Sequence, residues 1–275
     1  MSKPIRYIMY AVILIICATS IVVAVYSMEN KVGKQENTVI GEEGDENEEK
    51  STLEKFKGFF NNTITNIEAI ENLVPKIDPS KPAVFEAGFS ENQNGKYSID
   101  VHLPSININT DVGNQFNNAT NQNFSSRVGS LKSEQKATEF TIYETSYTGF
   151  VNDGILSVAI MGSIKQGDNA QRIILATYNY NVATGQEVKI GDIIQNRGLD
   201  TTAVNKKINN EIRKIQEESE SLAQTGYEVY KRKIEDEMYN ISNTTTFIQG
   251  PDGELYLIYA YGNTNNTSEI DVVEI

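Results

Sequence analysis

The sequence predicts an α+β domain, in which mostly antiparallel sheets pack against a few helices, after a single N-terminal transmembrane helix. Three observations lead to this prediction. From Lys96 onward, runs of period-two alternation are separated by short glycine-containing turns, a pattern typical of antiparallel strands. Residues 112–131 and 199–224 instead carry apolar side chains at helical spacing. Residues 7–26, finally, contain no charge.

The uncharged run YIMYAVILIICATSIVVAVY lies in an otherwise polar and acidic chain. As a helix it would be roughly 30 Å long, the thickness of a bilayer's hydrocarbon core. We expect residues 1–28 to form a retained signal anchor with the rest of the chain outside the cell, because the short head before the run is basic. A signal peptide cleaved after Ser27 is the alternative, but the apolar stretch exceeds the usual length of about 7 to 15 residues.

Two segments connect this anchor to the predicted domain. Residues 29–51 hold eight acids, three bases and few apolar residues, so we expect an acidic disordered linker. Residues 52–75 carry apolar side chains at helical spacing up to Pro75, which predicts an amphipathic helix. Such a helix packs on the domain or on a copy of itself; a helix lying on the membrane surface is the alternative.

The exported domain is expected to cover residues 96–275. Its first strand is YSIDVHLPSINI, in which Tyr97, Ile99, Val101 and Leu103 share one face. A helix over 112–131 follows in spite of its many asparagines. Three hairpins are then predicted from their turn residues, and a helix over 199–224, extended or restarted by YEVYKRKIEDEM, precedes the last of them. The hairpin turns are Asn152-Asp153-Gly154, Ala183-Thr184-Gly185-Gln186 and Pro251-Asp252-Gly253.

This order of elements resembles a known family. The strand YSIDVHLPSINI, the segment QFNNATNQNF, the stretch YNYNVATGQEVKIGDII and the hairpin FIQGPDGELYLIYAYGN together resemble the exported domain of RsiV-type anti-sigma factors. A similar domain of unknown function precedes the catalytic domain of some membrane-anchored peptidoglycan deacetylases. Only six residues precede the apolar run here and the sequence ends at Ile275, so neither sigma-factor binding nor deacetylation is implied. The resemblance implies only the exported domain, which in the anti-sigma factors binds lysozyme.

Composition restricts the chemistry of the domain. Residues 52–275 hold 19 bases and 29 acids, a formal charge of −10 that disfavours nucleic acid and anionic lipid and suits a basic protein or a neutral glycan, unless it serves solubility alone. The only cysteine, Cys17, lies in the apolar run, and the only histidine, His102, lies on the polar face of a predicted strand. A catalytic triad and a zinc site both need more than these two residues. Paired carboxylates remain possible for a glycosidase.

Two further features are weighed as candidate ligand sites. The turn at Asp252 and Gly253 lacks the ligand spacing of a calcium loop. Tyrosines at period-two spacing would suit a carbohydrate, although such tyrosines usually pack in a core or across strands. They are Tyr178, Tyr180, Tyr256, Tyr259 and Tyr261.

The sequence therefore favours a non-catalytic, membrane-anchored module of the bacterial cell envelope, placed outside the cytoplasm and without a cofactor. It would bind a cell-wall protein such as lysozyme, or peptidoglycan. The alternatives are a cell-wall enzyme that uses paired carboxylates and an assembly subunit of a membrane complex. Neither catalytic nor ligand-binding residues are identified from the sequence.

Overall fold

A computed structural model describes residues 51–133, 139–226, 229–262 and 268–275. Residues Lys50–Ile275 form one compact unit. The expected anchor over 7–26 and nearly all of the expected linker over 29–51 lie outside the described residues. Within the described part of the chain, no helix has both the length and the apolar character needed to cross a membrane.

The larger of two sheets has seven strands. Six follow one another across it in chain order, and β1 (Thr63–Thr65) pairs with β4 beside them. Neighbouring strands are antiparallel except at β3–β4 and β1–β4, which are parallel. The expected α+β class with mostly antiparallel pairing is confirmed. The six strands are β2 (Val84–Gln93), β3 (Tyr97–Ile106), β4 (Thr141–Asn152), β5 (Ile155–Gln166), β6 (Arg172–Asn181) and β7 (Gln186–Glu187).

The predicted turn residues do connect these strands. Asp153 and Gly154 adopt φ angles of 49° and 73° between β4 and β5, the left-handed conformation that a two-residue hairpin needs. Gly185 has a φ of 66° in the turn between β6 and β7. The second strand of that hairpin is only two residues long, because the chain enters helix α6 (Ile190–Asn196) directly afterwards.

Helices cover one face of the large sheet. The expected helix over 112–131 is present as α4 (Asp111–Thr120), a π-helical turn η1 (Asn121–Ser125) and α5 (Arg127–Ser133). Asn117 explains why an asparagine-rich helix is stable here. Its side chain exchanges two hydrogen bonds of 2.8 Å with the backbone of Ile106 at the end of β3. The large buried side chains of this layer are Phe116, Phe124, Val128 and Leu131.

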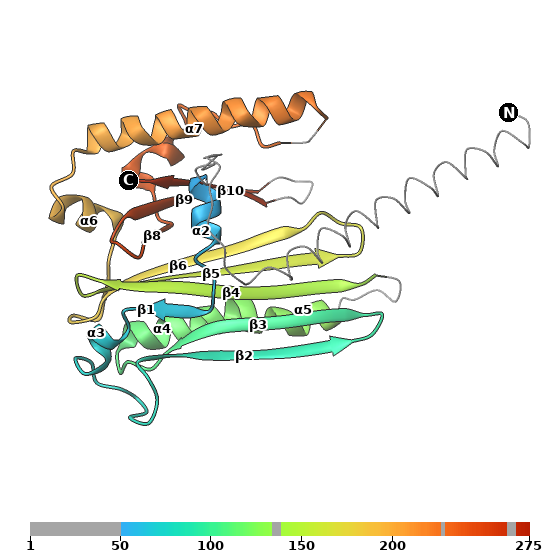
Figure 1. Ribbon diagram of the computed structural model, residues 1–275. Helices are drawn as coiled ribbons and strands as arrows, with labels where there is room; N and C mark the ends of the chain where they lie inside the picture. Colours follow the sequence, from blue (N-terminus) through green and yellow to red (C-terminus); the bar gives the residue numbers. More distant parts are fainter. Residues whose placement is uncertain (1–50, 134–138, 227–228, 263–267) are drawn as a thin grey trace, which may run out of the picture. The chain divides into compact units, whose positions relative to one another are not determined.

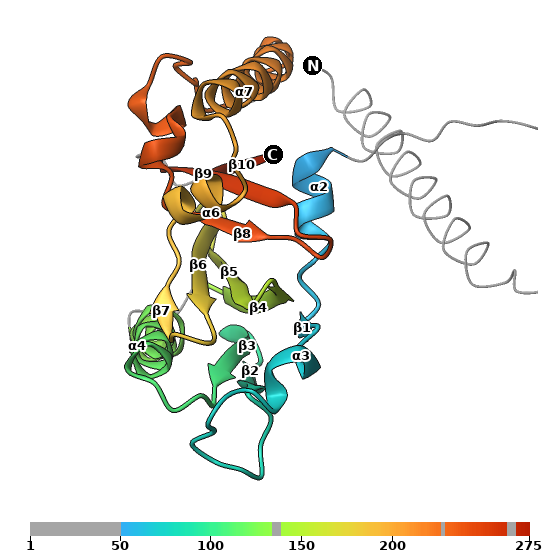
Figure 2. The same ribbon diagram turned by 90° about the vertical axis from the view of Figure 1, so that its left-hand side faces the viewer.

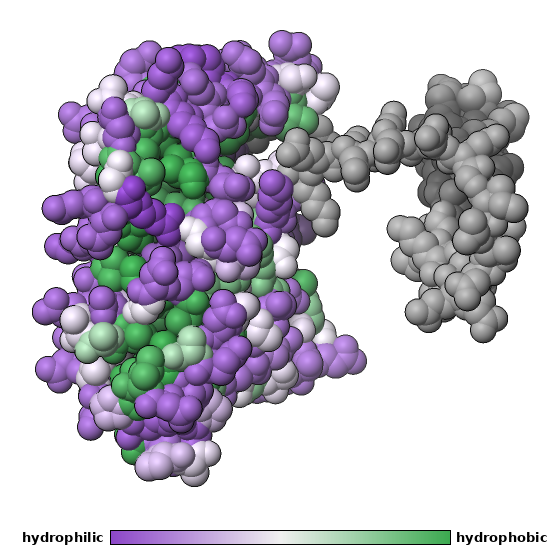
Figure 3. Space-filling model, turned by 60° about the vertical axis from the view of Figure 1, so that its left-hand side comes forward, coloured by the Kyte–Doolittle hydropathy of each residue, from purple (hydrophilic) through white to green (hydrophobic). Residues whose placement is uncertain are grey.

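A second, three-stranded sheet packs between the large sheet and the long helix α7 (Thr201–Gln224) (Figures 1 and 2). Leu257 and Tyr259 on β9 face the core shared with α6 and α7, whereas Tyr256 and Ile258 face the core shared with the large sheet. The outward side of α7 is polar, as the top of Figure 3 shows. The strands are β8 (Phe247–Gln249), β9 (Leu255–Gly262) and β10 (Ser268–Glu274); two short turns, η2 (Glu237–Tyr239) and η3 (Ile241–Asn243), precede them.

The segment after α7 is not the helix that we expected from YEVYKRKIEDEM. Gly226 has a φ of 94°, which ends the helical conformation. The backbone N–H groups of Tyr230 and Arg232 then donate to side chains, those of Glu269 and Gln216, rather than to a helical turn. Tertiary hydrogen bonds therefore override the helical pattern.

The expected continuous helix over 52–75 is also absent. The structure has a short helix α2 (Thr52–Lys57), strand β1 and the single turn α3 (Glu68–Glu71). Asn62 and Asn66 adopt φ angles of 60° and 61°, which break the helix on both sides of β1. The folded domain also begins before residue 96, because α2 and β1 pack on it and β2 pairs along the whole of β3.

Candidate functional site

The tyrosines that we considered for carbohydrate binding are part of the protein core. Tyr180, Tyr256, Tyr259 and Tyr261 are all buried. Tyr178 is partly buried and packs edge-on against Phe116, with 4.4 Å between the ring centroids. Their period-two spacing thus reflects packing on both faces of the sheets, and no flat aromatic surface is formed by them.

The only histidine lies on the open face of the large sheet, opposite the helices. His102 Nδ1 is 2.8 Å from Glu86 Oε1 and its Nε2 is 3.4 Å from Asp100 Oδ1. The hydrogen bond with Glu86 and the neighbouring Asp100 carboxylate raise the pKa of His102, although partial burial acts in the opposite direction. No hydroxyl or thiol nucleophile is hydrogen-bonded to its ring among the described residues. His102 is thus a partly exposed histidine on the polar face of a strand, as the sequence predicts; its contacts with Glu86 and Asp100 were not predicted.

A shallow groove of about 440 Å³ extends from His102 across this open face. Asp100 and Glu144 both line it and are partners in the register of the parallel strands β3 and β4. Because neighbouring strands are about 4.8 Å apart, their side chains are close enough to act on one ligand. Both carboxylates are open to solvent, so neither lies in the apolar environment that keeps a catalytic acid protonated.

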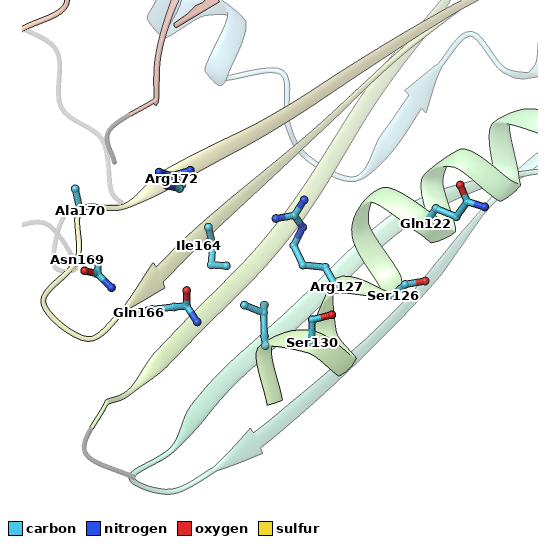
Figure 4. Close-up of a pocket in the computed structure, with 10 residues that line it drawn as sticks. Gln122, Ser126, Arg127, Ser130, Ile164, Gln166, Asn169, Ala170 and Arg172 are labelled. Atoms are coloured by element: carbon cyan, nitrogen blue, oxygen red, sulfur yellow. The ribbon is translucent and has the colours of Figure 1, made fainter. Parts of the chain in front are cut away.

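A larger cleft of about 620 Å³ lies on the helical side, between η1–α5 and the end of the β5–β6 hairpin (Figure 4). Its floor contains two buried aliphatic residues, Leu131 and Ile164. Arg172 is the register partner of Ile164 and so begins β6 at the edge of the floor. Polar residues form the remaining wall: Gln122, Ser126, Arg127, Ser130, Gln166 and Asn169.

The π-helical turn places the polar residues of one wall. A π turn is wider than an α turn and often occurs at functional sites. Here the carbonyl of Asn123 accepts a hydrogen bond of 3.3 Å from Arg127 Nε, and the carbonyl of Phe124 accepts one of 3.0 Å from the buried hydroxyl of Tyr143. Arg127 is therefore held through Nε while its guanidinium extends from the helix toward the strands (Figure 4).

Electrostatics in this cleft differ from those of the acidic domain as a whole. Burial raises the pKa of Tyr143 to about 12, and the nearby positive charge of Arg127 offsets part of that increase. The ten residues that line the cleft include two arginines and no acid, histidine or cysteine. Such a lining can donate hydrogen bonds to carboxylate, phosphate or hydroxyl groups. It offers no pair of groups for general acid–base catalysis.

Metal binding finds no support among the described residues, where no group of three or more histidine, cysteine, aspartate or glutamate side chains converges. The turn at Asp252 and Gly253 connects β8 and β9. The N–H of Gly250 donates to the carbonyl of Glu254 at 2.7 Å across this turn, which closes the hairpin, and a carboxylate oxygen of Glu254 accepts the N–H of Asp252.

Sequence reasoning did not identify either arginine of the cleft. Arg127 lies inside a helix-forming stretch, and Arg172 follows a turn, so neither stands out by spacing. They line the same cleft only because the crossover helices pack beside the β5–β6 hairpin. The only local signal of a binding site was the position of Arg172, which begins a strand directly after a loop rich in small polar residues.

The architecture is an α+β domain with a helical layer on one face of a mixed sheet and a smaller sheet on part of the other face.

The sequence matches no known family model, and no curated protein matches it. Two crystal structures of DUF3298 family proteins, members of a domain family of unknown function, are similar to it. One, from Pseudomonas aeruginosa, has a TM-score of 0.41 and 8% identity, covering 71% of this chain and 91% of that one. The other, from Bacteroides fragilis, has a TM-score of 0.34 and 11% identity, covering 73% and 92%.

Proposed function

We propose that this chain is a non-catalytic binding module of the bacterial cell envelope, held on the outer side of the cell membrane by residues 7–26. The observation that carries the proposal is the lining of the cleft in Figure 4, which has cationic and amide donors over an aliphatic floor and no acid–base pair. Ligand sites commonly combine an apolar surface with a few oriented polar groups. The cleft therefore serves recognition rather than chemical change.

The ligand that suits this cleft is a peptidoglycan fragment with a free carboxylate. Arg127 presents terminal guanidinium N–H groups that can bind a carboxylate in a bidentate manner. The amides of Gln122, Gln166 and Asn169 are suited to sugar hydroxyls and peptide groups. The aliphatic floor would accept the lactyl or alanyl methyl groups of such a fragment.

Calorimetric titration of the protein with a muramyl dipeptide tests this proposal. Arg127→Ala should weaken binding about tenfold or more, since a hydrogen bond to a charged group contributes about 1.5–3 kcal/mol. The matched control is Arg213→Ala, which removes an exposed arginine from α7, outside the cleft. Unchanged binding by the Arg127 variant, or an equal loss in the control, would refute the cleft as the site.

Binding of a basic protein such as lysozyme is a second candidate. The resemblance to RsiV-type domains motivates it, and so do Glu86, Asp100 and Glu144 around the open groove of the acidic domain. Charge attraction raises association rates chiefly at low salt, whereas a specific complex stays saturable near physiological ionic strength. Calorimetry with a basic lysozyme at low and physiological salt separates the two, and heat that vanishes at physiological salt would eliminate this candidate.

The enzyme alternative rests on Asp100 and Glu144 in the same groove. A glycosidase needs one carboxyl group kept protonated while the other is ionised, which two solvent-exposed groups do not favour. We expect no release of reducing sugar from peptidoglycan by the purified protein. Measurable hydrolysis that is abolished by Asp100→Asn or Glu144→Gln would overturn the non-catalytic proposal.

A further inference from the structure

Strand β2 is the outermost strand of the large sheet at the side opposite β6 and β7 (Figures 1 and 2). It pairs with β3 over ten residues, from Val84 opposite Ile106 to Gln93 opposite Tyr97. Within the described ranges, no strand pairs with its other edge. A long row of backbone donors and acceptors is therefore open to another strand.

Edge strands of natural proteins usually carry features that prevent pairing, and β2 has few of them. Lysine, proline, a bulge and short length are the common ones. The strand VFEAGFSENQ contains no lysine or proline, and its register with β3 has no interruption. Ala87, Gly88, Phe89 and Ser90 form an exposed, uncharged run at its centre, where Phe89 is 42% exposed.

We propose that β2 pairs with β2 of a second copy of this chain, antiparallel and centred on Gly88. This pairing is isologous, as the two-fold axis of a dimer requires. It places Ala87 of each copy opposite Phe89 of the other on the helical side of the sheet. Gly88 then faces its own counterpart at the two-fold axis. A side chain at Gly88 would clash with the carbonyl oxygen of Val101 on β3, so the glycine itself serves the close pairing of β2 with β3.

The charges of the strand fit this register. Glu86 of each copy lies opposite Ser90 of the other, so no two acids of β2 face each other. Glu91 lies opposite Phe85 of the second copy, and Lys81 Nζ is 4.7 Å from the centroid of that ring. Opposite-charge pairs across strands stabilise a sheet and like pairs destabilise it. An extended partner with another sequence would need to supply a comparable pattern, whereas a second copy already has it.

The overall charge of the domain opposes this association at long range. Two domains of formal charge −10 repel each other, and salt screens that repulsion. The dimer should therefore become tighter as salt increases, the reverse of attraction between opposite charges. The pairing joins two seven-stranded sheets into one continuous sheet with both helical layers on the same side.

The test compares two lysine substitutions in the full chain, purified in detergent, by sedimentation equilibrium. Phe89→Lys adds an edge-blocking charge beside the proposed axis and should raise the dimer dissociation constant at least tenfold. Phe140→Lys is the matched control, since Phe140 is 41% exposed and lies outside β2; it should have no such effect. Circular dichroism verifies that both variants stay folded. A monomeric parent chain, or equal effects of the two variants, overturns the proposal.

Cysteine cross-linking in membranes tests the register itself. In a Cys17→Ser background, Ala87→Cys with Phe89→Cys should give a disulfide-linked dimer under mild oxidation, because directly opposed Cβ atoms are about 4.5–5.5 Å apart. Arg213→Cys with Glu217→Cys, on the exposed side of α7, measures random collisions. Cross-linking no greater than in this control refutes pairing centred on Gly88.

Discussion

Replacing Arg232 by alanine should destabilise the protein more than any single surface substitution. Arg232 is 7% exposed, and each of the five N–H groups of its guanidinium has an acceptor. Nε and Nη2 donate to the two carboxylate oxygens of Asp271 at 2.6 and 2.7 Å. Nη1 donates to Ser219 and to the carbonyl of Tyr230, and Nη2 also donates to Glu269.

The magnitude follows from what the substitution leaves behind. Asp271 is 3% exposed and would keep only the hydroxyl of Tyr261, at 2.6 Å, as a hydrogen-bond donor among these side chains. Removing one partner of a buried ion pair costs about 3–5 kcal/mol. Because native domains are stable by about 5–15 kcal/mol, this is a large share of the total. The segment after α7 would lose the side-chain contacts of Arg232 with β10 and keep the hydrogen bond from the Tyr230 N–H to Glu269.

Urea unfolding followed by circular dichroism measures this loss at neutral pH. The substitution leaves the Asp271 carboxylate buried without its cation, whereas an amide at position 271 carries no charge. Adding Asp271→Asn to Arg232→Ala should therefore recover part of the lost stability at neutral pH. A loss below about 1 kcal/mol in Arg232→Ala, or no recovery in the double variant, would contradict this expectation.

Four further outcomes are expected. The NMR titration of His102 should give a pKa above about 6.5, and Glu86→Gln should lower that pKa. The interaction of His102 with Glu86 then stabilises the fold below about pH 6.5, and this stabilisation is lost as the pH rises through the raised pKa. An unshifted pKa would contradict this expectation. Tyr143→Phe should cost about 1–3 kcal/mol of unfolding free energy, because a buried carbonyl of the π-helical turn loses its donor; a cost near zero would show that water replaces the hydroxyl. A fragment that begins near Ser51 should be soluble and unfold in one cooperative thermal transition, whereas aggregation relieved only by detergent would assign residues 52–75 to the membrane. Protease added to cells without their wall should remove all but about the first 28 residues, and full protection of the C-terminal domain would refute the expected orientation.

Local chemistry explains which parts of the fold were predictable. The hairpin at Asp153 and Gly154 needs two adjacent residues that tolerate a positive φ, and few sequences supply them. The alternation in β3 reports which side of a strand is buried, because one face meets the helices and the other meets solvent. The helical stripe of α7 arises in the same way, since Val204, Ile208 and Ile212 are its buried apolar residues.

Elements whose conformation depends on distant partners were not predictable in this way. Residues 52–75 have a helical pattern, but their conformation is set by β4. The side chain of Asn62 accepts the N–H of Tyr147, which is 85 residues away in the sequence, and β1 pairs with β4. The edge strand β2 shows little alternation because most of its side chains are exposed. The extended segment at Arg232 is held by β10, not by its own helical propensity.

The α+β class, most strand and helix positions and the position of His102 on the polar face of a strand could be predicted from the sequence, which also favoured packing over ligand binding for the tyrosines. These properties follow from periodicity and turn chemistry, which act over a few neighbouring residues. Three features became apparent from the folded chain alone: the parallel pairing of β3 with β4, the open edge of β2 and the cleft lined by both Arg127 and Arg172. Each depends on how helices and strands that are distant in the sequence pack together, and a local sequence pattern does not identify a distant partner.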